Sequence, residues 1–436
     1  MVVKSMRALL GLMLLGLAMA AQAAPHIQSW TTQKGAKVLF VQADDLPMLD
    51  IRVVFDAGSA RDGELPGLAA FTNSVLTEGA GEWDAGALAR RVEDRGIRLG
   101  SGSLRDMGWL SVRTLSEPQT LEVAVETLSK VISSPRFDED AVERVRQQMQ
   151  IGLRQAEQSP GSIATRRFYR TLYADHPYAH PPEGTEESLT AINTALLRGF
   201  HQKHYVAANA VITMVGAIDR QQAEQIAEQL TAGIQRGQHA PALPDAPDVK
   251  GGELRQSFPS SQTHIYVGQL GVARHDPDYF PLYVGNHLFG GSSLVAILGE
   301  EVRNKRGLSY SVYSYFSPMR ANGPFLMVAQ TQNAKAGEAL DVMRDTLAEF
   351  IENGPSEEQL EQAKRNIIGG FPLKIASNGK IVEYISMIGF YNLPLNWLDT
   401  LTDKVDAVSA AQVRDAFRRR IGPANNIAVV VGGKPE

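Results

Sequence analysis

The sequence predicts an α+β fold made of two homologous domains, each a mainly antiparallel sheet with helices packed on one face. One observation is a self-similarity between the two halves of the chain, and a second is that strands come early and late in each half, around long central helices. The third is a Pro-rich segment that separates two regions, each long enough to bury its own core.

The self-similarity is clearest where each half ends. Residues 211–216 read Val-Ile-Thr-Met-Val-Gly, and residues 427–432 read Ile-Ala-Val-Val-Val-Gly. Each run follows a helical pattern and a turn that contains Asn, which is Asn209 in the first half and Asn425 in the second. Other landmarks recur at the same offset of about 210 to 220 residues, so two copies of one domain are the simplest account.

The boundary between the domains falls in residues 237–250, which contain Pro241, Pro244 and Pro247. Three Pro residues break any helix and favour an extended tether. We therefore expect an N-terminal domain over residues 25–236 and a C-terminal domain over residues 251–436.

Strands and helices within each half follow from the spacing of apolar residues. Residues 49–55 and residues 263–268 alternate in character along a short run, which predicts one strand in each half. Residues 138–158 and residues 338–353 carry the helical period, and each predicts a long helix between the strands.

The first 23 residues have the pattern of a secretory signal peptide. Lys4 and Arg7 precede an apolar run that ends in Ala-Gln-Ala, so we expect cleavage after Ala23. The run is too short for a comfortable membrane span, and no later stretch approaches the necessary length. The expectation is an exported protein without a membrane span after signal cleavage, periplasmic if the source is Gram-negative.

Composition excludes several classes of protein. The chain of 436 residues has a formal charge of -5, which becomes -7 once Lys4 and Arg7 are removed. This mild acidity gives no reason to expect nucleic acid or an anionic membrane as a partner. The absence of Cys excludes a disulfide framework and a thiolate metal site.

Three segments together resemble the pitrilysin/insulinase family of metallopeptidases, which use an inverted zinc motif. They are residues 66–79, residues 173–178 followed by Gly184 and Thr185, and residues 303–312, which read Arg-Asn-Lys-Arg-Gly-Leu-Ser-Tyr-Ser-Val. The resemblance covers nearly the whole mature chain. It implies half of a clamshell, as in the short bacterial members of the family that work as two chains.

The resemblance places the zinc motif of the family on a helix in which the required side chains are missing. A His-x-x-Glu-His helix needs two imidazoles at i and i+4 and a carboxylate that takes a proton from the zinc-bound water. The corresponding positions here are Ala70, Asn73 and Ser74, and Gln150 stands where the third ligand, a Glu, would be. An Ala methyl cannot coordinate, a Ser hydroxyl is a poor zinc ligand and an Asn amide is not a base near neutral pH. We therefore expect no metal in this chain.

Arg303 and Tyr310, seven residues apart, match a pair that the family uses in the second half of the peptidase. The resemblance implies that both face the substrate across a closed chamber. A guanidinium is a planar donor for substrate carbonyls or a terminal carboxylate, and a Tyr hydroxyl can donate to the oxyanion that forms when water attacks the scissile bond. Without the resemblance, Arg303 is interpreted as a solvated helix charge and Tyr310 as a half-buried strand aromatic.

Glycine-rich stretches occur at residues 285–293 and residues 100–103. Neither has the ending of a P-loop or the spacing of a dinucleotide fingerprint, so we expect them to allow a helix and a strand to pack closely. Two His pairs, His201 with His204 and His176 with His180, lack a carboxylate arranged as a proton acceptor. Packed or surface histidines are the simpler interpretation.

We therefore expect a zinc-free partner subunit of an exported metallopeptidase, predicted to be inactive alone. It would pair with a homologous chain that bears the intact His-x-x-Glu-His motif and the zinc, and would contribute Arg303 and Tyr310 to the cleavage of short peptides. One alternative is a catalytically inert interaction protein of the same fold. Another is an autonomous hydrolase with a different set of catalytic residues, for which no Ser elbow, Cys nucleophile or carboxylate pair gives support.

Overall fold

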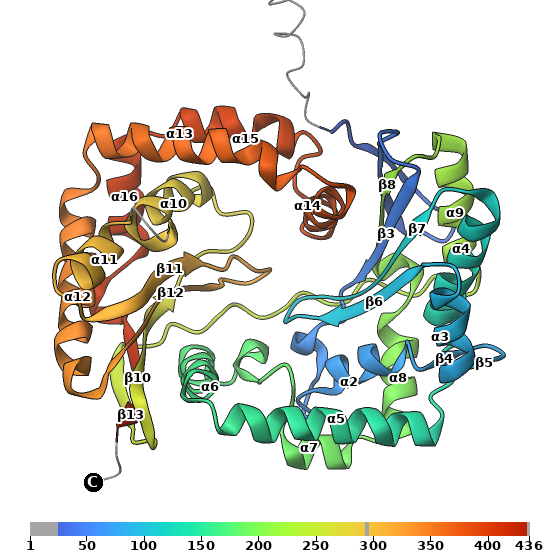
Figure 1. The fold of residues 1–436 in the computed structure, drawn as a ribbon, viewed down its shortest axis with the longest axis horizontal. Helices are drawn as coiled ribbons and strands as arrows, with labels where there is room; N and C mark the ends of the chain where they lie inside the picture. The colour runs from blue at the N-terminus through green and yellow to red at the C-terminus, as the bar shows by residue number, and fades with distance from the viewer. Residues whose placement is uncertain (1–24, 293–295, 434–436) are drawn as a thin grey trace, which may run out of the picture.

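The computed structural model describes residues 25–292 and 296–433, so the expected signal peptide lies outside the described residues. Two large sheets form the molecule, each with its own layer of helices (Figure 1). The strands of the first sheet fall between residues 28 and 216, and those of the second between residues 252 and 433. The predicted fold class is confirmed: both sheets are mainly antiparallel, with one parallel pair in each.

The first sheet has six strands in the order β1-β2-β8-β3-β7-β6. Their bounds are Gln28–Thr31 for β1, Lys37–Gln42 for β2, Ala210–Gly216 for β8, Met48–Phe55 for β3, Gly108–Leu115 for β7 and Arg98–Ser103 for β6. A small hairpin of β4 (Gly79–Ala80) and β5 (Trp83–Asp84) lies outside it. Every residue of β8 is buried, as its continuous apolar run requires of a strand that is covered on both faces.

The first domain has eight α-helices among the described residues, and all of them except α6 belong to the helical layer on one side of this sheet. Their bounds are Leu68–Val75 for α2, Ala85–Glu93 for α3, Pro118–Ser133 for α4, Glu139–Glu157 for α5, Pro160–Tyr173 for α6, Glu186–Ala191 for α7, Thr194–His204 for α8 and Arg220–Ala232 for α9. Leu49, Ile51, Val53 and Phe55 point from β3 into the core beneath them. The helix predicted over residues 138–158 is confirmed as α5.

The second sheet has five strands in the order β11-β12-β10-β13-β9. Their bounds are Ser309–Phe316 for β11, Pro324–Gln332 for β12, Ser260–Leu270 for β10, Ile427–Gly433 for β13 and Gly252–Gln256 for β9. The helices of this domain are Tyr279–Asn286 (α10), Ile297–Gly299 (α11), Ala336–Asn353 (α12), Glu357–Lys374 (α13), Asn378–Phe390 (α14), Trp397–Asp406 (α15) and Ala410–Arg420 (α16). The strand predicted at residues 263–268 and the helix at 338–353 are thus both confirmed.

The two domains exchange one helix each. α6 of the first domain packs on β10 and β13 of the second sheet, where Ala164, Phe168 and Leu172 meet Val429 and Val431. α14 of the second domain packs on β3 and β8 of the first sheet, where the Thr213 and Ser386 hydroxyl oxygens lie 2.8 Å apart. Figure 1 shows α14 between the two domains. The exchange covers the second face of both sheets, so each domain completes the core of the other.

A buried carboxylate ties the domains together at a second place. Asp106, 3% exposed in the loop between β6 and β7, accepts hydrogen bonds from the Tyr178 hydroxyl and, over 2.8 Å, from the Tyr391 hydroxyl at the end of α14. It also accepts one of 2.8 Å from the backbone N–H of Arg320 in the β11–β12 loop. Groups from both domains therefore satisfy one buried charge.

The linker at residues 237–250 forms no helix or strand and lies against the rest of the protein. The backbone carbonyl of Pro244 is 3.0 Å from His176 Nε2, and Leu243 and Val249 pack beside the α6 cluster. The segment is extended as expected, but it is docked rather than a free tether.

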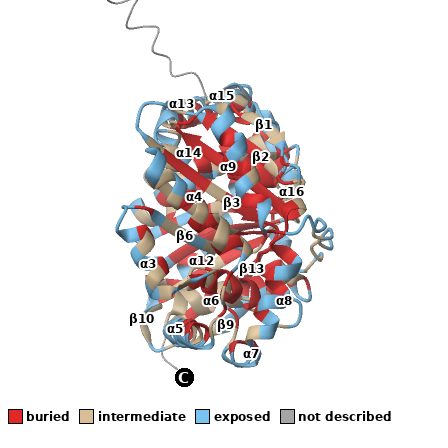
Figure 2. Ribbon diagram, turned by 90° about the vertical axis from the view of Figure 1, so that its right-hand side faces the viewer, coloured by how far each residue is buried: buried red, intermediate tan, exposed pale blue. Residues whose placement is uncertain are grey.

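Figure 2 shows how burial concentrates in the strands and the inner faces of the helices. In the part of the chain that the structure describes, no helix is both long enough and apolar enough to cross a membrane.

Candidate functional site

α2 carries three of the four positions expected for the zinc chemistry, and its start is tightly fixed. Gly67 precedes the helix with φ 90°, a conformation that favours Gly. The Asp62 carboxylate accepts the backbone N–H groups of Gly67 and Ala69, each over 2.7 Å, and so caps the first turn. Burial raises the pKa of Asp62 to about 7, although these two hydrogen bonds oppose the rise.

Asn73 stands where the catalytic carboxylate would be, and it is 1% exposed. Its Nδ2 donates to the Trp109 carbonyl of β7 over 3.2 Å and to the Tyr205 hydroxyl over 3.1 Å. Both donor hydrogens of the amide are therefore committed to the fold. Asn73 therefore joins α2 to the sheet and to the end of α8. Its amide is a structural contact and does not act as a proton acceptor.

Ala70 and Ser74 lie on the other side of α2 and line a pocket of about 470 Å³. The Ser74 hydroxyl donates to the Ala70 carbonyl over 2.9 Å, a local bond within the helix. The rest of the wall comes from α5, α6 and the loop before α7, and it includes Met149, Gly152, Leu153, Ala156, Ser162, Thr165, Arg166 and Glu183. The positions of the two imidazoles therefore share one face, as the spacing i and i+4 predicts.

Gln150 is on α5, which packs against α2, but it does not line this pocket. Its Nε2 approaches the Thr190 hydroxyl of α7 at 3.5 Å. The four expected positions therefore do not form one cluster of side chains: two face a pocket, one is buried and one faces α7. These residues do not fit a zinc ion, because none offers an available imidazole or carboxylate. Among the described residues, no group of three or more His, Asp or Glu side chains is arranged to hold a metal.

Arg303 and Tyr310 belong to the second domain, at the junction of a helix and an edge strand. Arg303 lies in the π-helical turn η5 (Glu300–Asn304), and its Nε donates to Asn304 Oδ1 over 3.0 Å. The backbone N–H of Gly307, with φ 57°, bonds to the Arg303 carbonyl and turns the chain into β11. The pair is thus not brought next to α2, which lies on the first domain.

Tyr310 is 92% exposed, so the interpretation as a half-buried strand aromatic is wrong. The reason is a break in the register of β11: Ser309 pairs with Thr331 and Ser311 with Gln330, which leaves Tyr310 as the extra residue of a bulge. A bulge re-aims one side chain and is common beside functional sites. β11 is also the edge strand of its sheet, so the exposed aromatic stands beside unpaired backbone groups.

The glycines of residues 285–293 act as expected. A Cβ at Gly290 would lie 2.7 Å from the backbone N of Ser314 in β11, and one at Gly285 would lie 2.5 Å from the ring of Phe417. A helical segment therefore approaches a strand and a second helix too closely for a larger residue. Residues 293–295 lie outside the described residues.

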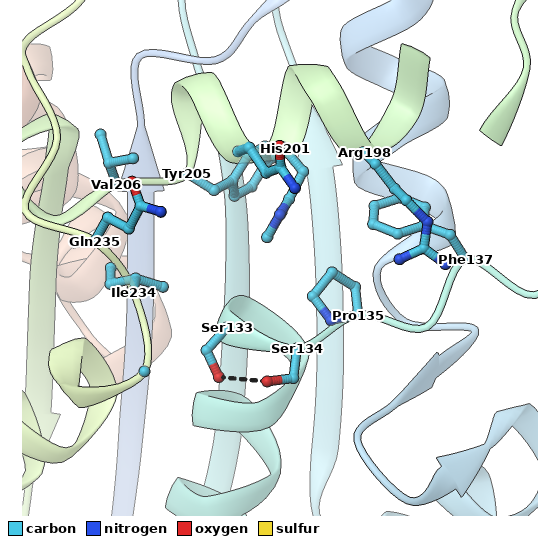
Figure 3. A pocket seen from close by; sticks show the side chains of 12 residues that line it. Ser133, Ser134, Pro135, Phe137, Arg198, His201, Tyr205, Val206, Ile234 and Gln235 are labelled. Carbon is cyan, nitrogen blue, oxygen red and sulfur yellow. Dashed lines mark hydrogen bonds between the residues drawn. The ribbon is translucent and has the colours of Figure 1, made fainter. Parts of the chain in front are cut away.

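Three histidines of the two pairs, His176, His201 and His204, are buried in the fold, and His180 is partly exposed. Figure 3 shows His201 beside Tyr205 in a pocket of about 330 Å³ on the first domain. The carbonyl of Ile132 is 2.8 Å from His201 Nε2, and the ring stacks on Tyr205. His204 is 4% exposed, and burial, with smaller effects from Lys203 and Arg61, lowers its pKa to about 4. His176 caps the short turn that carries Tyr178.

Sequence reasoning missed a group of arginines on the first sheet. Arg52 of β3, Arg113 of β7 and Arg98 of β6 line a cavity of about 240 Å³ together with Asp50 and Glu383. The sequence of β3 contained a sign of this group. Asp50 and Arg52 alternate with apolar residues that face the core, so both must lie on the opposite face of the sheet.

Comparison with known proteins gives matches over most of the chain. A family model described as the insulinase family, peptidase family M16, matches residues 37–186, and one described as the peptidase M16 inactive domain matches residues 191–367. The crystal structure of a peptidase M16 inactive domain from Pseudomonas fluorescens is 39% identical, with a TM-score of 0.91 over 94% of this chain and 98% of that one. A protease structure from Helicobacter pylori, 19% identical over 94% of this chain and 100% of that one, shares the fold with a TM-score of 0.86.

Two curated relatives carry different descriptions. The Bacillus subtilis (strain 168) protein described as an uncharacterized zinc protease, YmxG, is 23% identical over 397 residues, which are 90% of this chain and 95% of the relative. The Helicobacter pylori protein described as a non-peptidase homolog, also YmxG, is 25% identical over 413 residues, 93% of this chain and 94% of the relative.

Proposed function

Because the chain belongs to peptidase family M16, the insulinase family, as a member of the inactive type, we propose that it is the zinc-free partner subunit of an exported zinc metallopeptidase. The other subunit is a homologous chain that bears His-x-x-Glu-His and the zinc. This chain contributes groups that bind and polarise a short peptide. The complex works outside the cytoplasm, in the periplasm if the source is Gram-negative.

The observation that carries the proposal is the contrast between α2 and Tyr310. On α2, the position of the catalytic carboxylate is held by Asn73, and both donor hydrogens of its amide bond to the protein. On β11, a bulge exposes 92% of Tyr310, so the phenol is available to a partner chain or a substrate. α2 thus lacks the groups that bind zinc, and Tyr310 has a hydroxyl that makes no hydrogen bond within the described part of the chain.

The chemistry available to the pair suits acyl transfer. When water attacks a peptide bond, negative charge develops on the carbonyl oxygen, and a Tyr hydroxyl aimed at that oxygen stabilises it. A guanidinium stays charged at every physiological pH and can hold a second substrate carbonyl in place. Neither group requires a metal in its own chain, so both can act on a peptide bond that is attacked by water activated in the partner chain.

An extended peptide fits the exposed strand edges. β11 and β6 are edge strands, and each can accept one more strand through its unpaired backbone groups. Recognition through the backbone carries little sequence specificity, so short unstructured peptides are the expected substrates. The Helicobacter pylori relative described as a non-peptidase homolog supports a chain without its own activity.

The test is reconstitution. The purified chain is mixed with a zinc-bearing M16 chain from the same organism, and cleavage of a quenched fluorescent peptide is measured for each chain alone and for the mixture. We expect this chain to be inactive, and the mixture to exceed the zinc chain alone. In the mixture, Tyr310→Phe should lower kcat at least about tenfold, as loss of one oxyanion donor does, and Arg303→Ala should also lower the rate.

Tyr313→Phe is the matched control, because Tyr313 is on the same strand and is 40% exposed. It should leave the rate unchanged, and the melting temperature should be the same for all three variants. Full activity of the zinc chain alone, or normal rates with both Arg303→Ala and Tyr310→Phe, would falsify the proposal. A stable complex with no gain in cleavage would instead identify this chain as an inert interaction protein.

A further inference from the structure

The cavity of the three arginines lies on the face of the first sheet that α14 partly covers. Across the sheet, Arg98 of β6 pairs in register with Arg113 of β7, and Asp50 of β3 pairs with Arg113 on its other side. Gly379 and Val382 of α14 close the cavity from above. The cavity of about 240 Å³ therefore lies between a sheet edge and the first turns of a helix from the other domain.

Positive charge in this cavity is only partly compensated. Asp50 accepts two hydrogen bonds from Arg113, of 2.8 and 3.2 Å, and so forms a two-point ion pair with it. Glu383 is 3.9 Å from Arg52, and its side chain is 69% exposed. Arg98 has no ion pair or hydrogen bond among residues 25–292 and 296–433. Two like charges directly opposite each other on neighbouring strands are unfavourable unless something lies between them.

Arg52 is a second group in this cavity whose hydrogen-bonding capacity is not fully used. Its guanidinium stacks on the Trp109 ring at 4.2 Å, and its side chain is 14% exposed. Nε of Arg52 is buried and has no hydrogen-bond partner among the described residues. A buried donor without a partner is costly, and most native examples have a structural or functional reason.

The cavity is also next to an unpaired strand edge. Arg98, Gly100 and Gly102 of β6 face the same side as Arg113, Ser111 and Trp109 of β7. A peptide strand added to β6 places every second side chain, or its last residue, over this side of the sheet. Gly100 leaves the approach from β6 to the cavity open, since it carries no side chain.

We propose that this cavity binds the carboxylate of a peptide that pairs with β6, with Arg98 as the main contact and with Arg52 and Arg113 beside it. A carboxylate between Arg98 and Arg113 separates the two like charges and accepts charge-assisted hydrogen bonds. The inference rests on the proposed function for its choice of ligand, an extended peptide. It adds a chemical preference: the bound peptide presents an acid at this point, either its C-terminal carboxylate or an acidic side chain.

Binding to the purified chain alone tests this, without partner or cleavage. Fluorescence anisotropy is measured with a short Val/Thr-rich peptide labelled at its N-terminus, in three forms: a free C-terminal carboxylate, a C-terminal amide, and a C-terminal amide with one internal Glu. We expect the free acid to bind at least about fivefold tighter than the plain amide, from a charge-assisted hydrogen bond. If the internal Glu restores affinity, a side-chain carboxylate is also recognised; if it does not, the site reads the C-terminus.

The informative variant is Arg98→Gln, because Arg98 is exposed and its loss breaks no ion pair with the residues that the structure describes. Arg95→Gln is the matched control: it removes the same charge three residues away, at an exposed position that does not line the cavity. Arg98→Gln should abolish the difference between acid and amide, and Arg95→Gln should preserve it. Equal affinity for all three peptides, equal effects of the two variants, or no binding of any peptide would overturn this inference. The reconstitution test with Tyr310→Phe does not depend on that result.

Discussion

The Asn73 amide donates a hydrogen bond of 3.1 Å to the hydroxyl of Tyr205, which lies at the end of α8. In the family arrangement this is the place of a carboxylate that takes a proton from zinc-bound water, and here it is a fixed contact between two helices and a strand. Tyr205 is 2% exposed, and burial raises the pKa of its hydroxyl well above the usual range. The contact is therefore neutral and structural.

We predict that Asn73→Ala destabilises the protein by about 1 to 3 kcal/mol, because it leaves the Trp109 carbonyl and the Tyr205 hydroxyl without their donor in a buried place. Ser74→Ala, on the same helix, removes only a local bond to the Ala70 carbonyl and should change stability by much less. Urea unfolding of the two variants measures the difference. Equal midpoints would contradict a structural role for Asn73.

A designed zinc site tests whether positions 70 and 74 share a face. Ala70→His combined with Ser74→His places two imidazoles at i and i+4 on the wall of the same pocket. We expect zinc affinity at least about tenfold above that of Ser74→His alone, measured by competition with a chromogenic chelator. Gln150 faces α7 and does not take the place of the third ligand, whereas Glu183 lines the same pocket as positions 70 and 74. If the double variant bound no better than the single one, the frame assigned to α2 would be wrong.

Tyr391→Phe should weaken the contact between the domains. It removes one of three hydrogen bonds to the buried Asp106 carboxylate, and hydrogen bonds to charged groups are worth about 1.5 to 3 kcal/mol. The matched control is Tyr384→Phe, a half-buried Tyr of the same helix that does not contact Asp106. Thermal unfolding should show a lower melting temperature for Tyr391→Phe only, and similar losses for the two variants would argue against the contact.

The pH dependence of stability should change when His204 is removed. Its pKa is about 4 in the folded protein and about 6.5 in the unfolded chain. Below pH 6.5 the unfolded chain therefore binds a proton that the folded protein does not bind. The free energy of unfolding contributed by His204 then falls as the pH falls from 6.5 to 4, by up to about 3 kcal/mol.

Asp62 acts in the opposite direction over nearly the same range, since its folded pKa is raised to about 7. The folded protein binds a proton there that the unfolded chain releases, so the Asp62 contribution to stability grows as the pH falls. For this reason the test compares how steeply the free energy of unfolding changes with pH in the parent and in the variant. Between pH 7 and about pH 4.5, His204→Gln should lose less stability than the parent. Parallel curves for parent and His204→Gln would refute the assignment.

Much of the fold could be predicted because its signals are local. The alternation in β3, the apolar runs of β8 and β13 and the helical period of α5 and α12 each depend on neighbouring residues. The exchange of α6 and α14 was not predicted, because it depends on contacts between segments that are far apart in the sequence. One sign was present: β8 and β13 are apolar at successive positions, as expected for strands covered on both faces.

The site was predicted in part, for the same reason. The resemblance to the family pointed to Ala70, Asn73, Ser74 and Gln150, but it did not show that Gln150 faces α7 or that Asn73 donates to Tyr205. Arg303 and Tyr310 were chosen by resemblance, and the bulge that exposes Tyr310 could not be foreseen, since it depends on the pairing of β11 with β12. The Arg98 and Arg113 pair was missed because strand register decides which charges meet.

The sequence by itself determined two homologous α+β domains, their order and the absence of zinc ligands on α2, because periodicity and side-chain chemistry are properties of the residues themselves. Only the tertiary structure decided what replaced the missing chemistry. Packing turned Asn73 into a structural donor, a register shift exposed Tyr310, and sheet pairing placed Arg98 opposite Arg113. These outcomes depend on the geometry between distant segments, and that geometry is fixed only when the two domains complete each other's cores.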